Sequence, residues 1–484
     1  MSRFLRIFGF IYDWRMRFRW SGLVPALIVA FSMLAYGTLS ITRHEQFQTA
    51  GYDLGIFDQA VRHYAKFMAP LAPLKGVDFN LLGDHFHPIL AILAPFYWIW
   101  DDPIVLLVAQ TVLIGISIWL IWLFADRKLP GPLAVLVTAI YALGWPLQGM
   151  VDFDFHEVAF ALPLLAWAGL SLDEDRPRDG QLLVACLLLL LVREDMGACV
   201  FMLGFVRFMR RPRLPGLGLS ALGIAAFFLV VRVIVPALGS GFGYWQYSVL
   251  EQGPLAILKA VFWPADKTIT MLALLIPLAF LPLFSKFSLV ALPLLLQRFL
   301  ADRAALWTTE FHYNAPVWTI FTIAAISAAG RILEKRNAKR IMGLVAAVIL
   351  AAECVLSAGV YKQMFPLGTM LGDKSEVNAQ VEQKKQVISQ IPANTCITAS
   401  DRYIPHLTKS NRVTVPGIEA PEPDFIVLHM AEHPHPVFTH MSAQGEYDKA
   451  IQDGYEEIAR EGEAVLLRNP DYAGPREECG PLAG

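Results

Sequence analysis

Charged residues are scarce in this sequence of 484 residues. Only 17% of them are Asp, Glu, Lys or Arg, whereas 55% are hydrophobic. The net charge of −2 excludes the strongly basic surface that binds nucleic acid, so we expect no nucleic-acid partner. The alternation over about ten residues that marks a membrane β-barrel is missing as well. The sequence contains instead many apolar runs of about 20 residues, the length that crosses a bilayer as a helix.

Cysteine is also rare, with five residues in the whole sequence. Cys186, Cys199 and Cys354 lie in apolar runs, where cysteine usually serves as a small hydrophobic residue. Cys396 and Cys479 lie in the polar C-terminal region and can pair if that region faces an oxidising compartment. The sequence leaves this pairing open. No small-residue cleavage site follows the first apolar run, so we expect that run to remain as a membrane anchor.

The apolar runs predict an α-helical polytopic membrane protein with about eleven transmembrane helices. Residues 1–22 are rich in arginine, which places the N-terminus in the cytoplasm. Residues 23–360 form the predicted transmembrane domain, and 43–102 its first outer loop, where the short run 89–100 is typical of an interfacial or re-entrant helix. The predicted spans are 23–42, 103–125, 132–149, 158–172, 181–192, 197–208, 217–238, 269–284, 287–300, 315–330 and 342–360.

Residues 361–484 have a different composition, with many polar residues and no run long enough to span a membrane. Short strands are predicted at 395–400, 424–429 and 464–468, and a helix at 444–453. We therefore expect a small soluble α/β domain, which the topology places outside the cytoplasm. All 11 histidines fall in segments assigned to that side. Two of them, His44 and His63, are expected to be solvated loop residues.

The chain is organised around the polar segment Gly51-Tyr-Asp-Leu-Gly-Ile-Phe-Asp58, which follows the first span. Acidic side chains at a membrane boundary usually have a function. Asp53 lies between Gly51 and Gly55, where it has no helix to cap, so it is the leading candidate for a general base. Asp58 is the second candidate for this catalytic role.

A second group of candidates consists of carboxylates and imidazoles, the side chains that bind divalent cations or move protons. Asp84 also has a structural interpretation, as the cap of the helix expected near Pro88. The spacing of the group is not a strong metal motif. The candidate ligands for a cation such as Mg²⁺ or Mn²⁺ are Asp84, His85, His87, Asp154 and His156, and Glu157 is a further site residue.

The cluster Arg193-Glu194-Asp195 separates two short apolar runs. Arginine is the usual side chain for binding phosphate, so Arg193 is a candidate for contact with a phosphorylated substrate. Glu194 and Asp195 are further site candidates. The cluster can also be an internal ion pair that joins two helices. His312 and Tyr313, in a later outer segment, are the other candidates for phosphate binding.

Several of these motifs together resemble an uncharacterised bacterial family of polytopic membrane proteins. The resemblance covers most of residues 45–330 and extends into the tail. The motifs that carry it are Tyr52-Asp-Leu-Gly-Ile-Phe-Asp-Gln59, Gly83-Asp-His-Phe-His-Pro88, Asp154-Phe-His156, Arg193-Glu-Asp195, Ile391-Pro392, Ser400-Asp-Arg402, Pro405-His406 and Asp424-Phe-Ile-Val427. The family is similar in plan to the GT-C glycosyltransferases. Many members of that superfamily carry two adjacent carboxylates, which Asp53-x4-Asp58 does not match, so the identity of the base stays open.

The resemblance implies an enzyme of the bacterial cytoplasmic membrane that transfers a sugar, with inversion, from a polyprenyl-phosphate donor. The acceptor would be a glycan, lipid or protein of the cell envelope, and Asp53 would be the base. A divalent cation, or else Arg193, would neutralise the departing phosphate. A transporter or lipid flippase that uses the Arg193-Glu194-Asp195 cluster is the alternative, although we find no internal repeat of spans to support it. A sensor or assembly scaffold with a partner-binding tail is a third interpretation.

Overall fold

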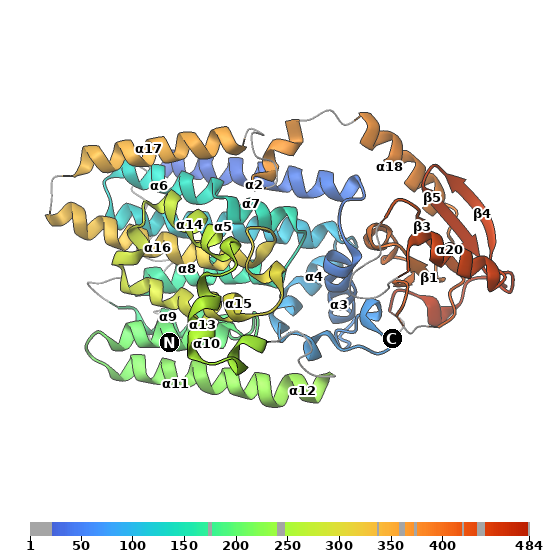
Figure 1. Cartoon of the computed structure of the whole chain (residues 1–484), viewed down its shortest axis with the longest axis horizontal. Coiled ribbons are helices and arrows are strands. Elements are labelled where there is room, and N and C mark those ends of the chain that lie inside the picture. Colours follow the sequence, from blue (N-terminus) through green and yellow to red (C-terminus); the bar gives the residue numbers. More distant parts are fainter. Residues whose placement is uncertain are drawn as a thin grey trace.

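The computed structural model describes residues 22–172, 177–239, 247–335, 338–357, 364–371, 375–418, 421–432 and 441–482. A bundle of helices occupies one end of the molecule, and a five-stranded sheet lies at the other end (Figure 1). Short helices of the first outer loop lie between the bundle and the sheet (Figure 1).

Most of the described residues in the bundle are helical. Its helices are α2 (Leu23–Glu45), α5 (Ile104–Lys128), α6 (Gly131–Leu143), α7 (Trp145–Asp152), α8 (Ala161–Ser171), α9 (Asp179–Leu189), α10 (Met196–Phe208), α11 (Leu214–Leu229), α12 (Val235–Leu238), α13 (Pro254–Phe262), α14 (Ala265–Leu275), α15 (Leu292–Leu300), α16 (Ala315–Lys335) and α17 (Lys339–Val355). The helical membrane domain that the apolar runs predict is therefore present.

The number of spans is not confirmed. Among the described residues, 5 helices are long and apolar enough to cross a membrane. They are Leu23–Glu45, Ile104–Lys128, Gly131–Asp152, Leu214–Leu238 and His312–Glu334. The count rises to 6 if α13 and the segment after it, which are bent by 55°, form one span. Helices α8, α9 and α10 are apolar but shorter, so length alone does not settle whether each of them spans.

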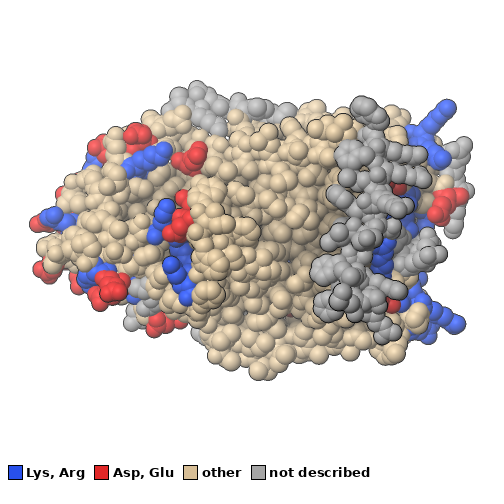
Figure 2. All heavy atoms as spheres, turned by 180° about the vertical axis from the view of Figure 1, so that it is seen from behind, with Lys and Arg blue, Asp and Glu red and all other residues tan. Residues whose placement is uncertain are grey.

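Charge is distributed along the long axis of the molecule as expected for a membrane protein. On the face seen in Figure 2, Lys, Arg, Asp and Glu gather towards the two ends, and a broad band between them is uncharged. Ionised side chains are costly in a hydrocarbon environment, so such a band is suited to contact with lipid.

The α10–α11 hairpin is packed closely through glycine. A Cβ atom on Gly204 would lie 2.3 Å from the Ser220 nitrogen, and one on Gly216 would lie 2.2 Å from the Phe208 nitrogen. Such distances are too short for any side chain, so the backbones of the two helices meet directly. Small residues play this role in membrane helix pairs, where packing has to replace the hydrophobic effect.

The first outer loop folds into several short helices. They are the π-helix η3 (Gly51–Gly55), α3 (Ile56–Ala65), the 3-10 helices η4 (Pro73–Lys75), η5 (Leu81–Gly83) and η6 (Pro88–Leu93), and α4 (Ala94–Tyr97). Helices η6 and α4 occupy most of the predicted interfacial run 89–100, and each begins with a proline in its first turn. A short, non-spanning helical segment is therefore present at this run, as predicted, and its interfacial position stays a prediction.

The tail contains a mixed sheet with strand order β2-β1-β3-β5-β4. Strand β1 (Cys396–Ala399) pairs in parallel with β2 (Arg412–Thr414) and β3 (Phe425–His429), whereas β5 (Ala464–Arg468) is antiparallel to β3 and to β4 (Glu456–Glu461). Helices α18 (Ser375–Ile388), α19 (Ile404–Leu407) and α20 (Ala443–Gln452) complete it. The three predicted strands and the helix at 444–453 are confirmed. Strands β2 and β4 and helix α18 were not predicted.

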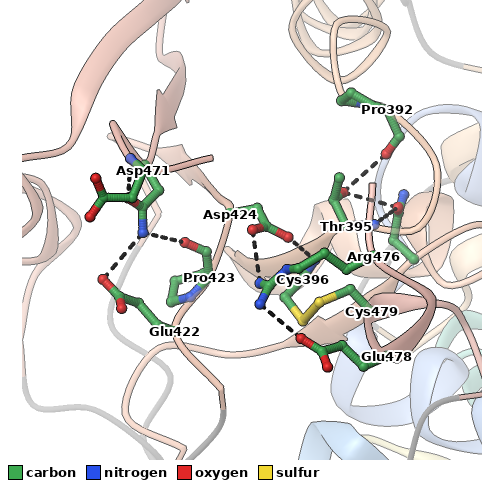
Figure 3. A network of polar contacts seen from close by, with 12 residues as sticks. Pro392, Thr395, Cys396, Glu422, Pro423, Asp424, Asp471, Arg476, Glu478 and Cys479 are labelled. Atoms are coloured by element: carbon green, nitrogen blue, oxygen red, sulfur yellow. Dashed lines mark hydrogen bonds and ion pairs between the residues drawn. A yellow bond between two sulfur atoms is a disulfide. The ribbon is translucent and has the colours of Figure 1, made fainter. Parts of the chain in front are cut away.

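The pairing that the sequence left open is present, because Cys396 and Cys479 form a disulfide. Asp424 lies beside it and accepts hydrogen bonds from the Cys396 backbone N–H at 2.8 Å and from the Arg476 Nη2 at 2.8 Å (Figure 3). These contacts fix the C-terminal segment to the start of β1.

The tail packs on the C-terminal end of α2. The imidazole of His44 stacks on that of His406 with 4.3 Å between ring centroids, and the Phe47 ring stacks on the other side of His406 at 3.8 Å. His44 is therefore buried, and His63 is buried as well, where its Nδ1 lies 2.8 Å from the Gln59 carbonyl oxygen. Both were expected to be solvated. That expectation was wrong because the folded outer loop and the tail cover them.

Candidate active site

The segment that carries Asp53 is the π-helix η3, directly after α2. Its glycines are required by close contact with the tail. A Cβ atom on Gly51 would lie 2.5 Å from the Ile404 Cβ, and one on Gly55 would lie 3.0 Å from the Ile404 Cγ2. Only glycine lets η3 approach α19 this closely. The two glycines that flank Asp53 thus allow its backbone to pack against the tail.

Two carboxylates hold this loop from opposite parts of the chain. The Tyr52 N–H donates to the Asp401 Oδ1 at 2.9 Å, and the Ala50 N–H donates to the Asp154 Oδ2 at 2.6 Å. Burial raises the pKa of Asp401 to about 6 and that of Asp154 to about 7. The backbone directly before Asp53 is therefore fixed at two positions, while the carboxylate of Asp53 is left for other contacts.

The carboxylate of Asp53 faces a cavity of about 180 Å³, which we name the Asp53 cavity. The cavity brings together side chains from the loop 43–102, from the segment between α7 and α8, from the α9–α10 junction, from α15 and from the segment between α15 and α16. Its lining includes Tyr52, Asp53, Phe57, Lys75, Asp84, His85, His87, Phe153, His156, Glu157, Arg193, Asp195, Gln297, Arg298, Arg303, His312 and Tyr313.

Most of the residues selected from the sequence therefore meet at one place. Asp53, His87 and His156, which are far apart in the chain, all line the Asp53 cavity. The His156 Nε2 lies 3.3 Å from the Asp53 Oδ1. The His156 ring stacks on that of His312 with 3.7 Å between centroids, and Phe153 lies against both rings. These stacked rings fix the direction of the nitrogen that faces Asp53.

The cluster at the α9–α10 junction forms a buried network. Arg193 binds Asp195 through two contacts of 2.9 and 2.5 Å, and its Nη1 lies 3.4 Å from the Glu157 Oε1. Glu194 accepts from the Phe86 N–H at 3.1 Å and lies 2.7 Å from the His85 Nδ1. This arrangement agrees with the ion-pair interpretation of the cluster and links it to the outer loop.

The His85–Glu194 contact is an ion pair at neutral pH. Burial acts to lower the pKa of His85, but the Glu194 carboxylate outweighs it and raises the pKa to about 9. Burial acts to raise the pKa of Glu194, but His85 and the nearby Arg193 lower it to about 2. His85 thus carries a positive charge at the edge of the Asp53 cavity.

The five candidate metal ligands do not form one site. Asp84 is paired with Lys75, His85 with Glu194, and Asp154 faces the backbone of Ala50. Within the described ranges, the only three potential ligands that meet are Cys396, Asp424 and Cys479, and the two sulfurs of that group form the disulfide. The arrangement of side chains therefore does not fit a cation held by Asp84, His85, His87, Asp154 and His156.

Asp58 does not reach the Asp53 cavity. Its side chain is 0% exposed and accepts from the Arg62 Nε at 2.8 Å and from the Tyr97 hydroxyl at 2.7 Å. A carboxylate enclosed in this way cannot meet an acceptor. Glu194 and Asp154 also lie outside the lining of the cavity. They contact residues in the lining or next to it, Glu194 through His85 and Asp154 through the Ala50 N–H.

Sequence reasoning missed three cations at the Asp53 cavity. Lys75 pairs with Asp84. Arg298 is buried and donates to the carbonyl oxygen of Tyr313 at 2.8 Å. Arg303 is exposed, and its side chain makes no hydrogen bond or ion pair to another described residue. Arg298 had a signal in the sequence, because a charged residue inside an apolar run usually has a function.

Comparison with known proteins agrees with this architecture. The profile of a family described as predicted membrane protein (DUF2079) matches residues 43–466. A search of curated proteins gave no match. ArnT from Cupriavidus metallidurans bound to undecaprenyl phosphate aligns with a TM-score of 0.56 and 13% identity, over 95% of this chain and 100% of that chain. The apo state of the same ArnT gives 0.52 and 12%, over 93% and 99%.

The similarity to ArnT is one of fold, since the identity is low. It shows that this chain shares the fold of ArnT. The apo oligosaccharyltransferase of Archaeoglobus fulgidus aligns at a TM-score of 0.39 and 12% identity, over 83% of this chain and 65% of that chain, and this similarity is too low to support an argument.

Proposed function

We propose that this chain, which belongs to the DUF2079 family of predicted membrane proteins, is a glycosyltransferase that uses a polyprenyl-phosphate sugar as donor. The observation that carries the proposal is the position of Asp53. Its carboxylate faces a polar cavity between the helical bundle and the loop 43–102, and two hydrogen bonds fix the backbone of this loop just before Asp53. Fixed geometry of this kind is what a general base requires.

In this proposal, Asp53 accepts the proton of an acceptor hydroxyl. The hydroxyl oxygen bonds to the anomeric carbon of the donor, the bond from that carbon to the lipid phosphate breaks, and the phosphate leaves with the electron pair. Direct attack inverts the anomeric carbon. The imidazole of His156, 3.3 Å from Asp53, orients the carboxylate.

The cavity offers several cations for the departing phosphate. Arg193, Arg298 and Arg303 all line it. The charge of Arg193 is largely offset by Asp195, whereas Arg303 has no carboxylate partner among the described residues and is open to a ligand. Fixed positive groups stabilise the charge that develops on the phosphate. His312 and Tyr313 are proposed to complete the phosphate site.

The cation predicted from the sequence has no fitting set of ligands, so no step of the proposal depends on Mg²⁺ or Mn²⁺. In the proposal, the arginines neutralise the departing phosphate in place of the metal. The requirement for a cation is tested by turnover in the presence of a chelator, which we expect to leave the rate unchanged.

The donor and the location are also part of the proposal. Undecaprenyl phosphate is the lipid bound in the similar ArnT structure, which supports a polyprenyl-phosphate lipid here. We place the protein in the bacterial cytoplasmic membrane with its N-terminus inside and residues 361–484 outside. The disulfide between Cys396 and Cys479 supports this orientation, since such bonds persist in oxidising compartments. The acceptor is then a glycan, lipid or protein of the cell envelope.

The test is turnover of labelled polyprenyl-phosphate sugars by purified protein. We expect Asp53→Asn to reduce transfer by roughly 10²-fold or more, because a general base typically contributes that much. Asp78→Asn, an exposed carboxylate of the same outer loop, is the matched control and should keep full activity. Movement of lipid or solute across vesicles without any sugar transfer would contradict the proposal and favour a transporter or flippase.

A further inference from the structure

A second cavity, of about 580 Å³, lies where the outer end of α2, helix α18 and the sheet meet. We name it the sheet cavity. Ser400 directly after β1, Val415 directly after β2, and His429 at the end of β3 all line it. These are the carboxyl ends of the three parallel strands. The chain passes from β1 to β2 on one side and then to β3 on the other, and such a reversal of strand order is where α/β sheets bind ligands.

The polar lining of the sheet cavity has mixed charge. Two cations, Lys384 and Arg402, and three carboxylates, Asp401, Glu432 and Glu446, line it, and glutamines and apolar side chains cover much of the rest. The carboxylates disfavour a multiply charged anion. A hydroxyl group both donates and accepts hydrogen bonds, so it suits a site where donors and acceptors alternate. The apolar side chains suit the C–H faces of a sugar ring.

Several of these polar groups are buried without a complete set of partners. Glu432 Oε2 and His429 Nδ1 have no hydrogen-bond partner among the described residues. Burial raises the pKa of Glu432 to about 7. Lys384 is only 7% exposed, and its Nζ lies 5.8 Å from the ring centroids of Phe47 and of Tyr403. Buried polar atoms are costly unless another molecule completes their hydrogen bonds.

The sheet cavity adjoins the Asp53 cavity. Asp401 lines the former and Tyr52 lines the latter, and the hydrogen bond from the Tyr52 N–H to the Asp401 Oδ1 connects them. The neighbouring Arg402 donates to the Gln48 carbonyl oxygen at 2.7 Å. One hydrogen bond thus joins the linings of the two cavities, and a molecule in the sheet cavity lies next to Asp401, which holds the loop that carries Asp53.

We propose that the sheet cavity binds a neutral, hydroxyl-rich saccharide, which is part of the acceptor of the transfer reaction. The proposal rests on the proposed function for the role of the saccharide as acceptor, but its binding chemistry stands on the sheet cavity alone. The tail then selects the acceptor, while the membrane domain binds the donor.

The experiment measures binding and turnover separately, on the full-length protein in detergent. Neutral oligosaccharides built from glucose, galactose or N-acetylglucosamine are the probes, and inorganic phosphate is the anionic comparison. Binding is followed by saturation-transfer NMR and titration calorimetry. The variants are Lys384→Met, which keeps the apolar stem, and Glu432→Gln, which keeps the shape. Glu456→Gln, an exposed residue of β4 outside both cavities, is the control.

We expect at least one of the neutral saccharides to bind, and each of the two variants to weaken its binding roughly tenfold or more, since each removes a buried hydrogen-bonding group. Glu456→Gln and Asp53→Asn should bind like the wild type. Absence of saccharide binding by folded protein, binding that neither variant weakens, or preferential binding of phosphate would overturn the inference. If Asp53→Asn keeps full turnover while saccharide binding follows the expected pattern, the proposed function fails and the binding site stands.

Discussion

Replacement of Gly51 by alanine tests how far the tail controls the Asp53 loop. The added Cβ atom would lie 2.5 Å from the Ile404 Cβ, and ordinary van der Waals contact begins at 3.4 Å, so η3 and α19 would have to separate by about 0.9 Å. A misplacement of about 1 Å at a reacting group can reduce turnover by about 10²-fold. Overpacking of this kind typically costs about 1–3 kcal/mol of stability.

The assay compares sugar transfer and thermal unfolding of Gly51→Ala with those of Gly343→Ala. Gly343 lies in α17 with nothing within 4 Å of its added Cβ, so alanine there should be tolerated or slightly stabilising. Removal of the Ile404 side chain beyond Cβ should restore part of the activity of Gly51→Ala, because the Ile404 Cδ1 and Cγ2 are the other close atoms. Wild-type turnover and stability in Gly51→Ala would refute the claim that this contact positions Asp53.

Three further results are expected. The folded-state pKa of Asp154 is raised to about 7, so its protonation stabilises the fold, and this stabilisation is lost as pH rises from about 4 to about 7. The melting temperature of the wild type should fall over this range by an amount that Asp154→Asn removes; an unchanged pH profile in the variant would contradict this. Arg303→Ala should raise the KM for the donor without changing the melting temperature, because Arg303 is exposed, and Arg303→Lys should recover part of the loss; equal KM values in all three proteins would exclude a phosphate contact. Cys396→Ser or Cys479→Ser should destabilise the tail by about 2–4 kcal/mol in chemical denaturation, and identical unfolding curves would show that the disulfide is dispensable.

Local patterns were sufficient for the class of protein and for much of the tail. The strands at 396–399, 425–429 and 464–468 follow from short apolar segments between turn residues. The helical membrane domain follows from long apolar runs. The number of spans does not, because helices such as α9 and α10 are apolar yet short, and their place in a bilayer depends on what surrounds them.

The sequence predicted which residues belong to the candidate site, but not which of their side chains contact one another. Asp53, His87 and His156 carry functional chemistry in polar outer segments, and they do share the Asp53 cavity. The position of Asp53 between two glycines made it the first candidate, but nothing in the local sequence excluded Asp58, five residues later. The fold does so by enclosing Asp58 between Arg62 and Tyr97.

The sequence by itself determined where the chain is apolar, where it is polar and which reactive side chains stand at the boundary, because hydrophobicity and side-chain chemistry are properties of each residue. Only the tertiary structure decided which of those side chains neutralise one another and which stay open to a substrate. Asp84 and Lys75 cancel each other, and His85 and Glu194 do the same, while Arg303 faces the cavity. Such pairings depend on distances between segments remote in the chain, and these distances are set by packing of the whole fold.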